Sequence, residues 1–218
     1  MTVITISREL GSGGSYISKQ VAQSLGYHLV EKDTLQKVLS QYGFAQFEDE
    51  YESAPSFWER LDSDRIMMIE MLNKVIQAVA QHGNVVLLGR GSFAVLNNYR
   101  DVLNVRIQAP LPIRVRRVMA EQNITDLEKA ETLVKESDRV RSTFLQSWYG
   151  VRWDTAGMFD LVVDTSKVPC DLAVRWILEV HEVMGEIQAE GQPAMDTLQV
   201  DSLLAKAVAD TLECAIMH

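Results

Sequence analysis

The N-terminal segment constrains the fold more than any other part of this chain, because it joins an apolar strand, a glycine-rich turn and a helix. Residues 3–6 are mostly apolar, the turn Gly-Ser-Gly-Gly follows at 11–14, and apolar residues then recur with helical spacing over 17–25. Glycines let successive backbone N–H groups turn inward around an anion, and the helix N-terminus adds partial positive charge. The segment therefore predicts a phosphate-binding loop. The alternative is a βα turn that needs glycine only for its tight backbone geometry.

This loop lacks one residue that phosphate-binding loops normally carry. In the standard motif a lysine follows the last glycine and reaches the β- and γ-phosphates. Here Gly14 occupies that place, and Ser15 follows it. The loop therefore has the backbone expected of a phosphate site without its usual side-chain cation.

Length and composition predict one main domain with additions. The chain has 218 residues, of which 47% are hydrophobic, so it can bury a sizeable core. No apolar run approaches the roughly 20 residues that a membrane span needs, and the chain opens with a strand rather than a signal-like segment. Cys170 and Cys214 lie far apart without partners at metal-ligand spacing, which argues against a disulfide framework or a zinc site. We therefore expect a soluble cytoplasmic protein that does not act at a membrane.

The acidic charge balance restricts the class of partner. The formal net charge is −9 at pH 7, whereas broad nucleic-acid binding relies on a positive face. We therefore expect no nucleic-acid polymer as a partner. A local cluster of arginines can still create a positive cleft for a small anion.

Apolar runs with strand character alternate with longer helical patterns over most of the chain. This alternation predicts βαβ units and a parallel sheet, which is an α/β fold. Strands are expected near 3–6, 28–30, 85–88, 103–107 and 159–163; helices are expected near 14–25, 33–39, 57–82, 126–148, 171–186 and 196–216, with one more carrying 114–117, a loop at 46–56 and a linker at 189–193.

Arg90 follows the wholly apolar strand at 85–88. In open α/β sheets, ligands bind outside the carboxyl ends of the strands, and a charge at the end of a buried strand is costly without an anionic partner. The position therefore predicts a contact to a ligand phosphate. A structural salt bridge is the alternative.

Two later helices also carry arginines that share a face. Arg114 and Arg117 are three residues apart, as are Asp138 and Arg141. Guanidinium groups grip phosphate oxygens with two hydrogen bonds, which suits phosphoryl transfer. Taken singly, such charged faces are more often simply solvated.

Five motifs in this order together resemble the cytidylate kinase-like proteins, which belong with the nucleoside monophosphate kinases of the P-loop superfamily. They are Ile-Ser-Arg-Glu-Leu-Gly-Ser-Gly-Gly (6–14), Gly-Arg (89–90), Arg-Val-Arg-Arg (114–117), Asp-Arg-Val-Arg (138–141) and Trp-Asp-Thr-Ala-Gly-Met-Phe-Asp-Leu-Val-Val-Asp-Thr-Ser (153–166).

The resemblance covers about residues 3–182 and implies a three-layer P-loop fold with a parallel central sheet. It implies one kinase-like domain over 1–188, in which 33–82 is a helical insertion that binds the acceptor monophosphate and 118–150 is a lid. Residues 189–218 would then form a linker and an extra C-terminal helix.

The resemblance also implies roles for particular residues, with ATP and Mg²⁺ as cofactors. Arg8 replaces the first glycine of the standard loop and is a candidate for the missing lysine's charge. Glu31 and Asp33, after the second strand, could bind a base or ribose or lie beside Mg²⁺, or could be ordinary carboxylates at a helix N-terminus. Arg90 would hold the acceptor phosphate. The loop would bind the donor phosphates through Gly11, Ser12, Gly13, Gly14 and Ser15, and Ser15 would also bind the metal. Catalytic groups from the lid side would be Arg114, Arg117 and Arg141.

Two departures from the kinase pattern leave two functions open. The kinases that this chain resembles carry lysine and aspartate where Gly14 and Leu88 stand. Loss of the lysine could abolish catalysis or transfer its task to Arg8 or Lys19. One hypothesis is therefore an ATP-dependent kinase whose acceptor is a nucleoside monophosphate, with CMP or dCMP the leading candidate. The other is a nucleotide-binding regulatory module with little or no turnover.

Two further expectations concern apolar residues. Trp153 and Phe159 are expected to pack in the core rather than against a nucleobase. The C-terminal helix carries an apolar stripe that a solvated tail would expose, which predicts a homodimer. The alternative is that the stripe folds back on the chain itself. The stripe consists of Val200, Leu203, Leu204, Ala207, Val208, Leu212 and Ile216.

Overall fold

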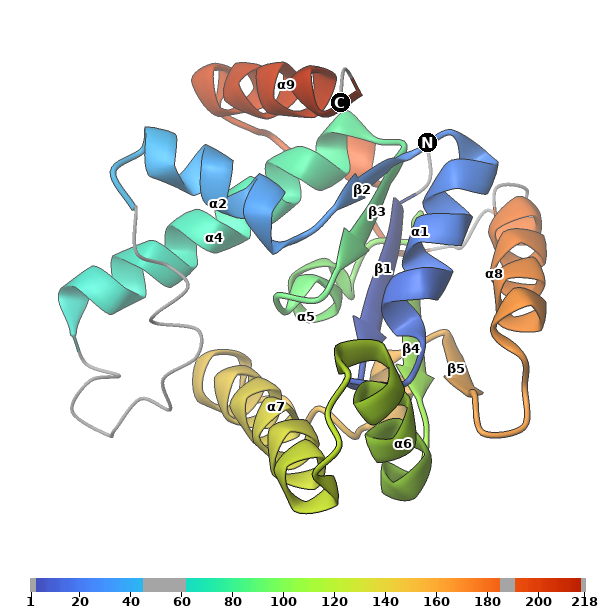
Figure 1. The fold of residues 1–218 in the computed structure, drawn as a ribbon. Coiled ribbons are helices and arrows are strands. Elements are labelled where there is room, and N and C mark those ends of the chain that lie inside the picture. The colour runs from blue at the N-terminus through green and yellow to red at the C-terminus, as the bar shows by residue number, and fades with distance from the viewer. Residues whose placement is uncertain (1–2, 45–61, 185–190, 217–218) are drawn as a thin grey trace.

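The computed structural model describes residues 3–44, 62–184 and 191–216, and these contain a five-stranded parallel sheet (Figure 1). The strand order is β2-β3-β1-β4-β5, with every neighbouring pair parallel. The fold class predicted from the sequence is thereby confirmed. The strands are β1 (Val3–Arg8), β2 (His28–Val30), β3 (Val85–Leu88), β4 (Val102–Gln108) and β5 (Leu161–Asp164).

Most helices lie near their expected positions, but the short helix at 92–96 is not among those expected, and the C-terminal helix begins at Ser202 rather than near 196. The expected loop at 46–56 and the first residues of the helix expected from 57 lie outside the described residues. In the described part of the chain, that helix begins after Asp62, whose carboxylate accepts a hydrogen bond from the Asp64 N–H. The main helices are α1 (Gly14–Leu25), α2 (Lys32–Gln41), α4 (Ser63–His82), α5 (Ser92–Leu96), α6 (Leu111–Gln122), α7 (Leu127–Tyr149), α8 (Cys170–Met184) and α9 (Ser202–Ile216).

The sheet is covered on both faces, which gives three layers. Alternate residues of a strand point to opposite faces, and β3 illustrates this: Val85 and Leu87 pack in one core with α4, α5 and α9, whereas Val86 and Leu88 pack in another with α1 and α8. Because both faces are buried, the strand is apolar throughout. Figure 1 shows α1 and α8 together on one side of the sheet and α4 on the other.

Parallel pairing brings the carboxyl ends of the first three strands to one edge of the sheet. Ile6 of β1 pairs with Leu88 of β3, and Val30 of β2 pairs with Leu87. Residues that follow these strands therefore emerge side by side at the place where α/β folds bind ligands.

The last strand begins two residues later than expected. Phe159 stacks at 4.6 Å between ring centroids on Phe93, and the Asp160 N–H donates to the Asn104 carbonyl at 2.8 Å. A one-turn helix at 156–158 precedes them, so the chain joins the sheet only at Leu161. Trp153 is buried, as the sequence predicts, and its Nε1 donates to Ser7 Oγ at 2.8 Å.

The C-terminal helix packs on its own chain. Leu204, Val208 and Leu212 of α9 are buried in the core that α4 and α2 contribute to, whereas Leu203 is 71% exposed. The expectation that this stripe is exposed for a partner is therefore wrong, and the fold-back alternative is what occurs. The physical reason is that α4 and α2 leave an apolar groove that α9 fills.

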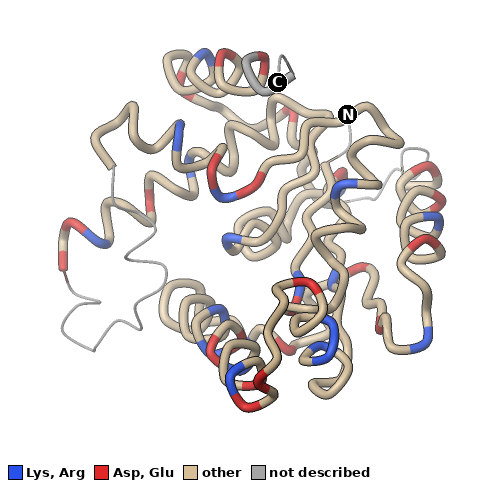
Figure 2. Tube along the Cα trace, viewed as in Figure 1, with Lys and Arg blue, Asp and Glu red and all other residues tan. Residues whose placement is uncertain are grey.

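Charged residues of both signs alternate along α7 (Figure 2). It carries ion pairs between Lys135 and Glu131 and between Arg139 and Glu136, whose side chains are all more than two-fifths exposed. Among the described residues, no helix combines the length and apolar character needed to cross a membrane.

Candidate active site

The glycine-rich loop is pressed against two helices. Gly11 and Gly13 have positive φ values of 77° and 82°, a conformation that favours glycine. A Cβ on Gly11 would lie 2.6 Å from the Arg114 carbonyl oxygen on α6, and one on Gly13 would lie 2.7 Å from the Cys170 Sγ on α8. The loop therefore depends on glycine for both its backbone shape and its close packing.

Side chains behind the loop hold its carbonyl groups. Thr165 Oγ1 donates to the Ser12 carbonyl at 2.7 Å, and Arg117 Nη1 donates to the Gly11 carbonyl at 3.3 Å. The carbonyl groups are thus turned backward. The backbone N–H groups at the start of α1 have no hydrogen-bond partner within the helix, and groups of this kind commonly bind anions.

Ser12 is the loop residue that the structure places away from the cavity. Its side chain is fully buried, and both its N–H and its hydroxyl donate to the Glu9 carbonyl, at 3.2 and 2.8 Å. The sequence suggested a phosphate contact for Ser12, but these two bonds commit its polar groups to the turn itself.

A cavity of about 310 Å³ lies over the N-terminus of α1. Four of the five predicted loop residues line it, and the Ser15 side chain is exposed there. We call it the loop cavity. Its lining includes Arg8, Glu9, Gly11, Gly13, Gly14, Ser15, Tyr16, Glu121 and Arg141.

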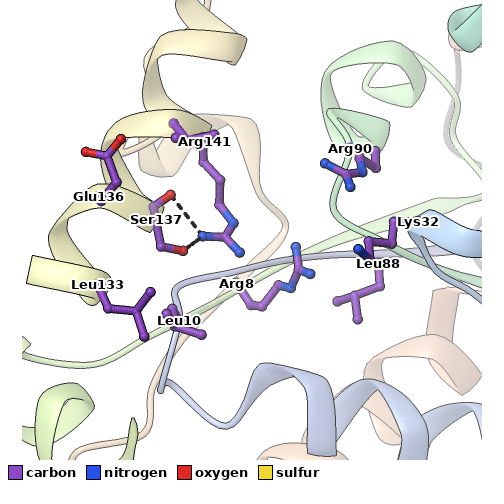
Figure 3. A pocket seen from close by; sticks show the side chains of 10 residues that line it. Arg8, Leu10, Lys32, Leu88, Arg90, Leu133, Glu136, Ser137 and Arg141 are labelled. Carbon is purple, nitrogen blue, oxygen red and sulfur yellow. Dashed lines mark hydrogen bonds between the residues drawn. The ribbon is translucent and has the colours of Figure 1, made fainter. Parts of the chain in front are cut away.

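A second cavity of about 390 Å³ adjoins the first and is strongly basic. We call it the basic cavity. Figure 3 shows Arg141 reaching down from α7 toward Arg8, with Arg90 and Lys32 on the opposite side. Both cavities share Arg8, Leu10 and Arg141. The lining of the basic cavity combines Arg8, Lys32, Arg90, Arg141 and Glu136 with Leu10, Leu88, Leu133, Val140 and Ser137.

Arg90 stands in an uncommon backbone conformation. Its φ is 55°, between Gly89 at 76° and Gly91 at 75°, and left-handed geometry costs a non-glycine residue about 1–2 kcal/mol. The residue is 8% exposed and lines the basic cavity. Such strain persists where the surrounding structure enforces it, as it commonly does at functional sites.

Arg141 is directed toward the cavities by its own helix. Its Nη1 donates to the Ser137 carbonyl at 2.9 Å and also contacts the Ser137 hydroxyl (Figure 3). Arg139, two residues earlier, lines neither cavity and instead forms a half-exposed pair with Glu136. The two arginines of the same motif therefore face different environments.

Arg114 and Arg117 line neither cavity among the described residues, although the sequence placed them with Arg141. Arg114 is 5% exposed and bonds the Asp138 carboxylate and the Ala109 carbonyl. Arg117 donates to Gly11 and to the hydroxyl and carbonyl of Thr165. Both side chains belong to α6, which packs behind the loop, so these contacts hold the loop in place.

Glu31 and Asp33 are exposed at the start of α2 and line neither described cavity. Lys32, between them, lines the basic cavity. The sequence analysis did not single out Lys32, which stands between two carboxylates. Its position two residues after β2 was the available signal, since β2 ends beside β3.

Glu9 is a second residue that sequence reasoning missed. Its carboxylate accepts from the Ala109 N–H at 3.0 Å and pairs with Arg106 and Arg114, each at 3.2 Å. Burial lowers the pKa of Arg106, and the Glu9 charge opposes that effect. This buried network ties the residue before the glycine turn to β4 and α6.

Comparison with known proteins agrees with this geometry. The sequence profile of the cytidylate kinase-like family matches residues 3–167. A cytidylate kinase of Pyrobaculum aerophilum is 31% identical over 182 residues, covering 82% of this chain and 92% of the relative. One of Pyrobaculum arsenaticum is 31% identical over 178 residues, covering 80% and 90%.

A solved structure supports the fold independently. The crystal structure of an uncharacterized protein from Eubacterium ventriosum matches with a TM-score of 0.66 at 21% identity, covering 84% of this chain and 99% of that one. Because the family profile spans most of the chain and two relatives exceed 30% identity over most of their length, this chain belongs to the cytidylate kinase-like family.

Proposed function

We propose that this protein transfers a phosphoryl group from ATP to a nucleoside monophosphate, with CMP or dCMP as the leading acceptor. The observation that carries the proposal is the pair of adjoining cavities that share Arg8 and Arg141. Phosphoryl transfer requires a donor and an acceptor held in line, with cations around the migrating group. Two cavities joined by two arginines meet that requirement.

The loop cavity takes the donor phosphates. Gly11, Gly13, Gly14 and Ser15 line it at the N-terminus of α1, where backbone N–H groups and the helix dipole favour phosphates. In the transfer, an oxygen of the acceptor phosphate forms a bond to the γ-phosphorus while the bond to the β,γ-bridging oxygen breaks. The electron pair stays on that oxygen, which leaves as part of ADP.

The basic cavity takes the acceptor monophosphate. Arg90 and Lys32 stand on its far side from the loop, and Arg8 and Arg141 stand between the two cavities. The names of the relatives favour a cytidine nucleotide. They give no support to the alternative of a regulatory module without turnover.

Magnesium would be held by Ser15 together with the nucleotide. The exposed Ser15 hydroxyl lines the loop cavity, and Mg²⁺ is commonly bound by few protein ligands plus phosphate oxygens and water. At the end of β3, Leu88 offers no carboxylate. When bound, the ion would neutralise phosphate charge.

The two helical segments complete the proposal. Residues 33–82 would form the acceptor-binding insertion and 118–150 the lid, since Lys32, directly before the first segment, and Arg141, within the second, reach the basic cavity from opposite sides. The cytoplasmic location remains a prediction, as does the homodimer, which now lacks the exposed stripe that suggested it.

ADP release from ATP and Mg²⁺ tests the proposal over a panel of nucleoside monophosphates. We expect turnover with CMP or dCMP, and a higher KM for the acceptor in Arg90→Lys, which keeps the charge but loses the two-point grip. Arg152→Lys is the matched control, because Arg152 is exposed, pairs with Asp154 and lines neither cavity. Absence of ADP release with every acceptor would refute the proposed activity.

A further inference from the structure

The standard phosphate-binding loop carries glycine at its first position and lysine directly after its last glycine. This chain has Arg8 at the first position and Gly14 at the lysine position. A cation and a glycine are both present, but in exchanged places. Whether the exchange matters depends on where the Arg8 side chain runs.

Arg8 is the last residue of β1, and its side chain runs directly over Gly14. A Cβ on Gly14 would collide with the Arg8 Cβ and lie 2.9 Å from its Cγ. Gly14 is itself buried and has no positive φ that would require glycine. The absence of a side chain at Gly14 is therefore explained by the room that Arg8 occupies.

The far end of Arg8 is confined by a second glycine. A Cβ on Gly89 would collide with the Arg8 Nη1 and lie 3.3 Å from its Cζ. The stem of Arg8 thus lies against Gly14 and its guanidinium lies against Gly89. Figure 3 shows that guanidinium between Arg141 on one side and Arg90 and Lys32 on the other.

Arg8 also stands where a transferred group would pass. It lines the loop cavity and the basic cavity, and it lines a smaller cavity beside Gly89, Arg90 and Trp153. Lys19, which the sequence left open as a substitute for the lysine, is exposed on α1 and lines none of these. Of these two candidates, Arg8 alone has access to both cavities.

We propose that Arg8 supplies, from the end of β1, the cation that standard loops supply from the position of Gly14, and that Gly14 is glycine because Arg8 covers it. The inference rests on the proposed phosphoryl transfer. In that reaction the Arg8 guanidinium neutralises charge on the bridging oxygen as it leaves with ADP. A preorganised cation at such a place commonly raises the rate by about 100-fold or more.

Reciprocal substitution tests the exchange. Arg8→Gly removes the cation, and Gly14→Lys alone forces a new side chain into Arg8, so each single variant should lower kcat at least about 100-fold. The double variant Arg8→Gly with Gly14→Lys rebuilds the standard arrangement and should recover kcat to within about tenfold of the parent. A double variant as inactive as Arg8→Gly would overturn the proposal.

Two further variants separate charge from folding. Arg8→Met keeps an unbranched stem without the charge, so it should fold with an unchanged Tm and still lose kcat as Arg8→Gly does. Arg116→Gln is the matched control, because Arg116 is exposed on α6, donates to the Pro112 carbonyl of its own helix and lines neither cavity. Parental kcat in a folded Arg8→Met would also overturn the proposal.

Inorganic tripolyphosphate distinguishes failure of this inference from failure of the proposed kinase activity. If the parent protein releases no ADP with any acceptor, calorimetry can still measure how tightly tripolyphosphate binds, and that affinity depends on the cation at the loop. Arg8→Met should then bind at least about tenfold more weakly, and the Arg8→Gly with Gly14→Lys variant should regain affinity. Equal affinity of the parent and Arg8→Met would refute the role of Arg8 whatever the activity.

Discussion

Arg114 on α6 and Asp138 on α7 form a two-point ion pair. Nη1 lies 3.1 Å from Oδ1 and Nη2 lies 2.8 Å from Oδ2. The same guanidinium meets the Glu9 carboxylate at 3.2 Å, and Glu9 precedes the glycine turn. One arginine therefore connects the proposed lid helix with the segment that leads into the loop.

Breaking this pair should lower stability. Asp138→Asn removes one of the two carboxylates that pair with the buried Arg114, and we expect the free energy of unfolding to fall by about 2 kcal/mol. Urea unfolding measures the change. Glu136→Gln on the same helix is the control, since its exposed pair with Arg139 should contribute nothing measurable. Equal unfolding of the two variants would show that Arg114 does not need Asp138.

Arg141 should matter for turnover and not for folding. Arg141→Ala removes a cation shared by both cavities, so kcat should fall about 100-fold while the Tm changes little. Arg139→Ala, on the exposed face of α7, should keep the parental kcat. If the two variants have the same kcat, Arg141 has no part in the reaction.

The two glycines that bound α1 should respond differently to valine. Both have positive φ, 82° at Gly13 and 65° at Gly26, so valine strains both backbones. Only Gly13 meets a neighbour, since nothing lies within 4 Å of a Cβ on Gly26. Calorimetry should show nucleotide binding lost in Gly13→Val and kept in Gly26→Val. Retained affinity in Gly13→Val would remove the loop from the binding site.

The C-terminal helix should contribute to the stability of its own chain. Leu212→Ala empties a buried position, and such changes cost about 2–5 kcal/mol. Leu203→Ala, at a position that is 71% exposed, should leave stability unchanged. Light scattering should give one mass for the parent and both variants. A halved mass in Leu203→Ala would instead show that the exposed face holds a dimer.

His28 should make stability depend on pH. Burial lowers its pKa below the ordinary value of 6.5, and the nearby His82 adds to this effect. The unfolded chain therefore binds a proton at a higher pH than the folded chain, so this contribution to stability is lost as pH falls below about 6.5. Urea unfolding at pH 7.5 and 5.5 should show a smaller difference in His28→Gln than in the parent. An unchanged difference would exclude His28 as a source.

The sequence determined the elements and the fold class. Local periodicity indicates which face of a segment is buried. The wholly apolar run Val85–Leu88 therefore predicts a central strand with both faces covered. The glycine turn at 11–14 predicts the start of α1. The location of Arg90 at this edge of the sheet could also be predicted, because its place after a buried strand follows from chain order alone. Four of the five predicted loop residues line the loop cavity, because they also follow a buried strand.

Only the tertiary structure decided which charged side chains share a cavity. Arg114, Arg117 and Arg141 have similar helical spacing, yet α6 packs its arginines behind the loop whereas α7 turns Arg141 toward the cavities. Lys32 reaches the basic cavity because β2 pairs beside β3. Periodicity along one helix gives the face on which a residue lies, but the neighbour that covers that face comes from distant parts of the chain.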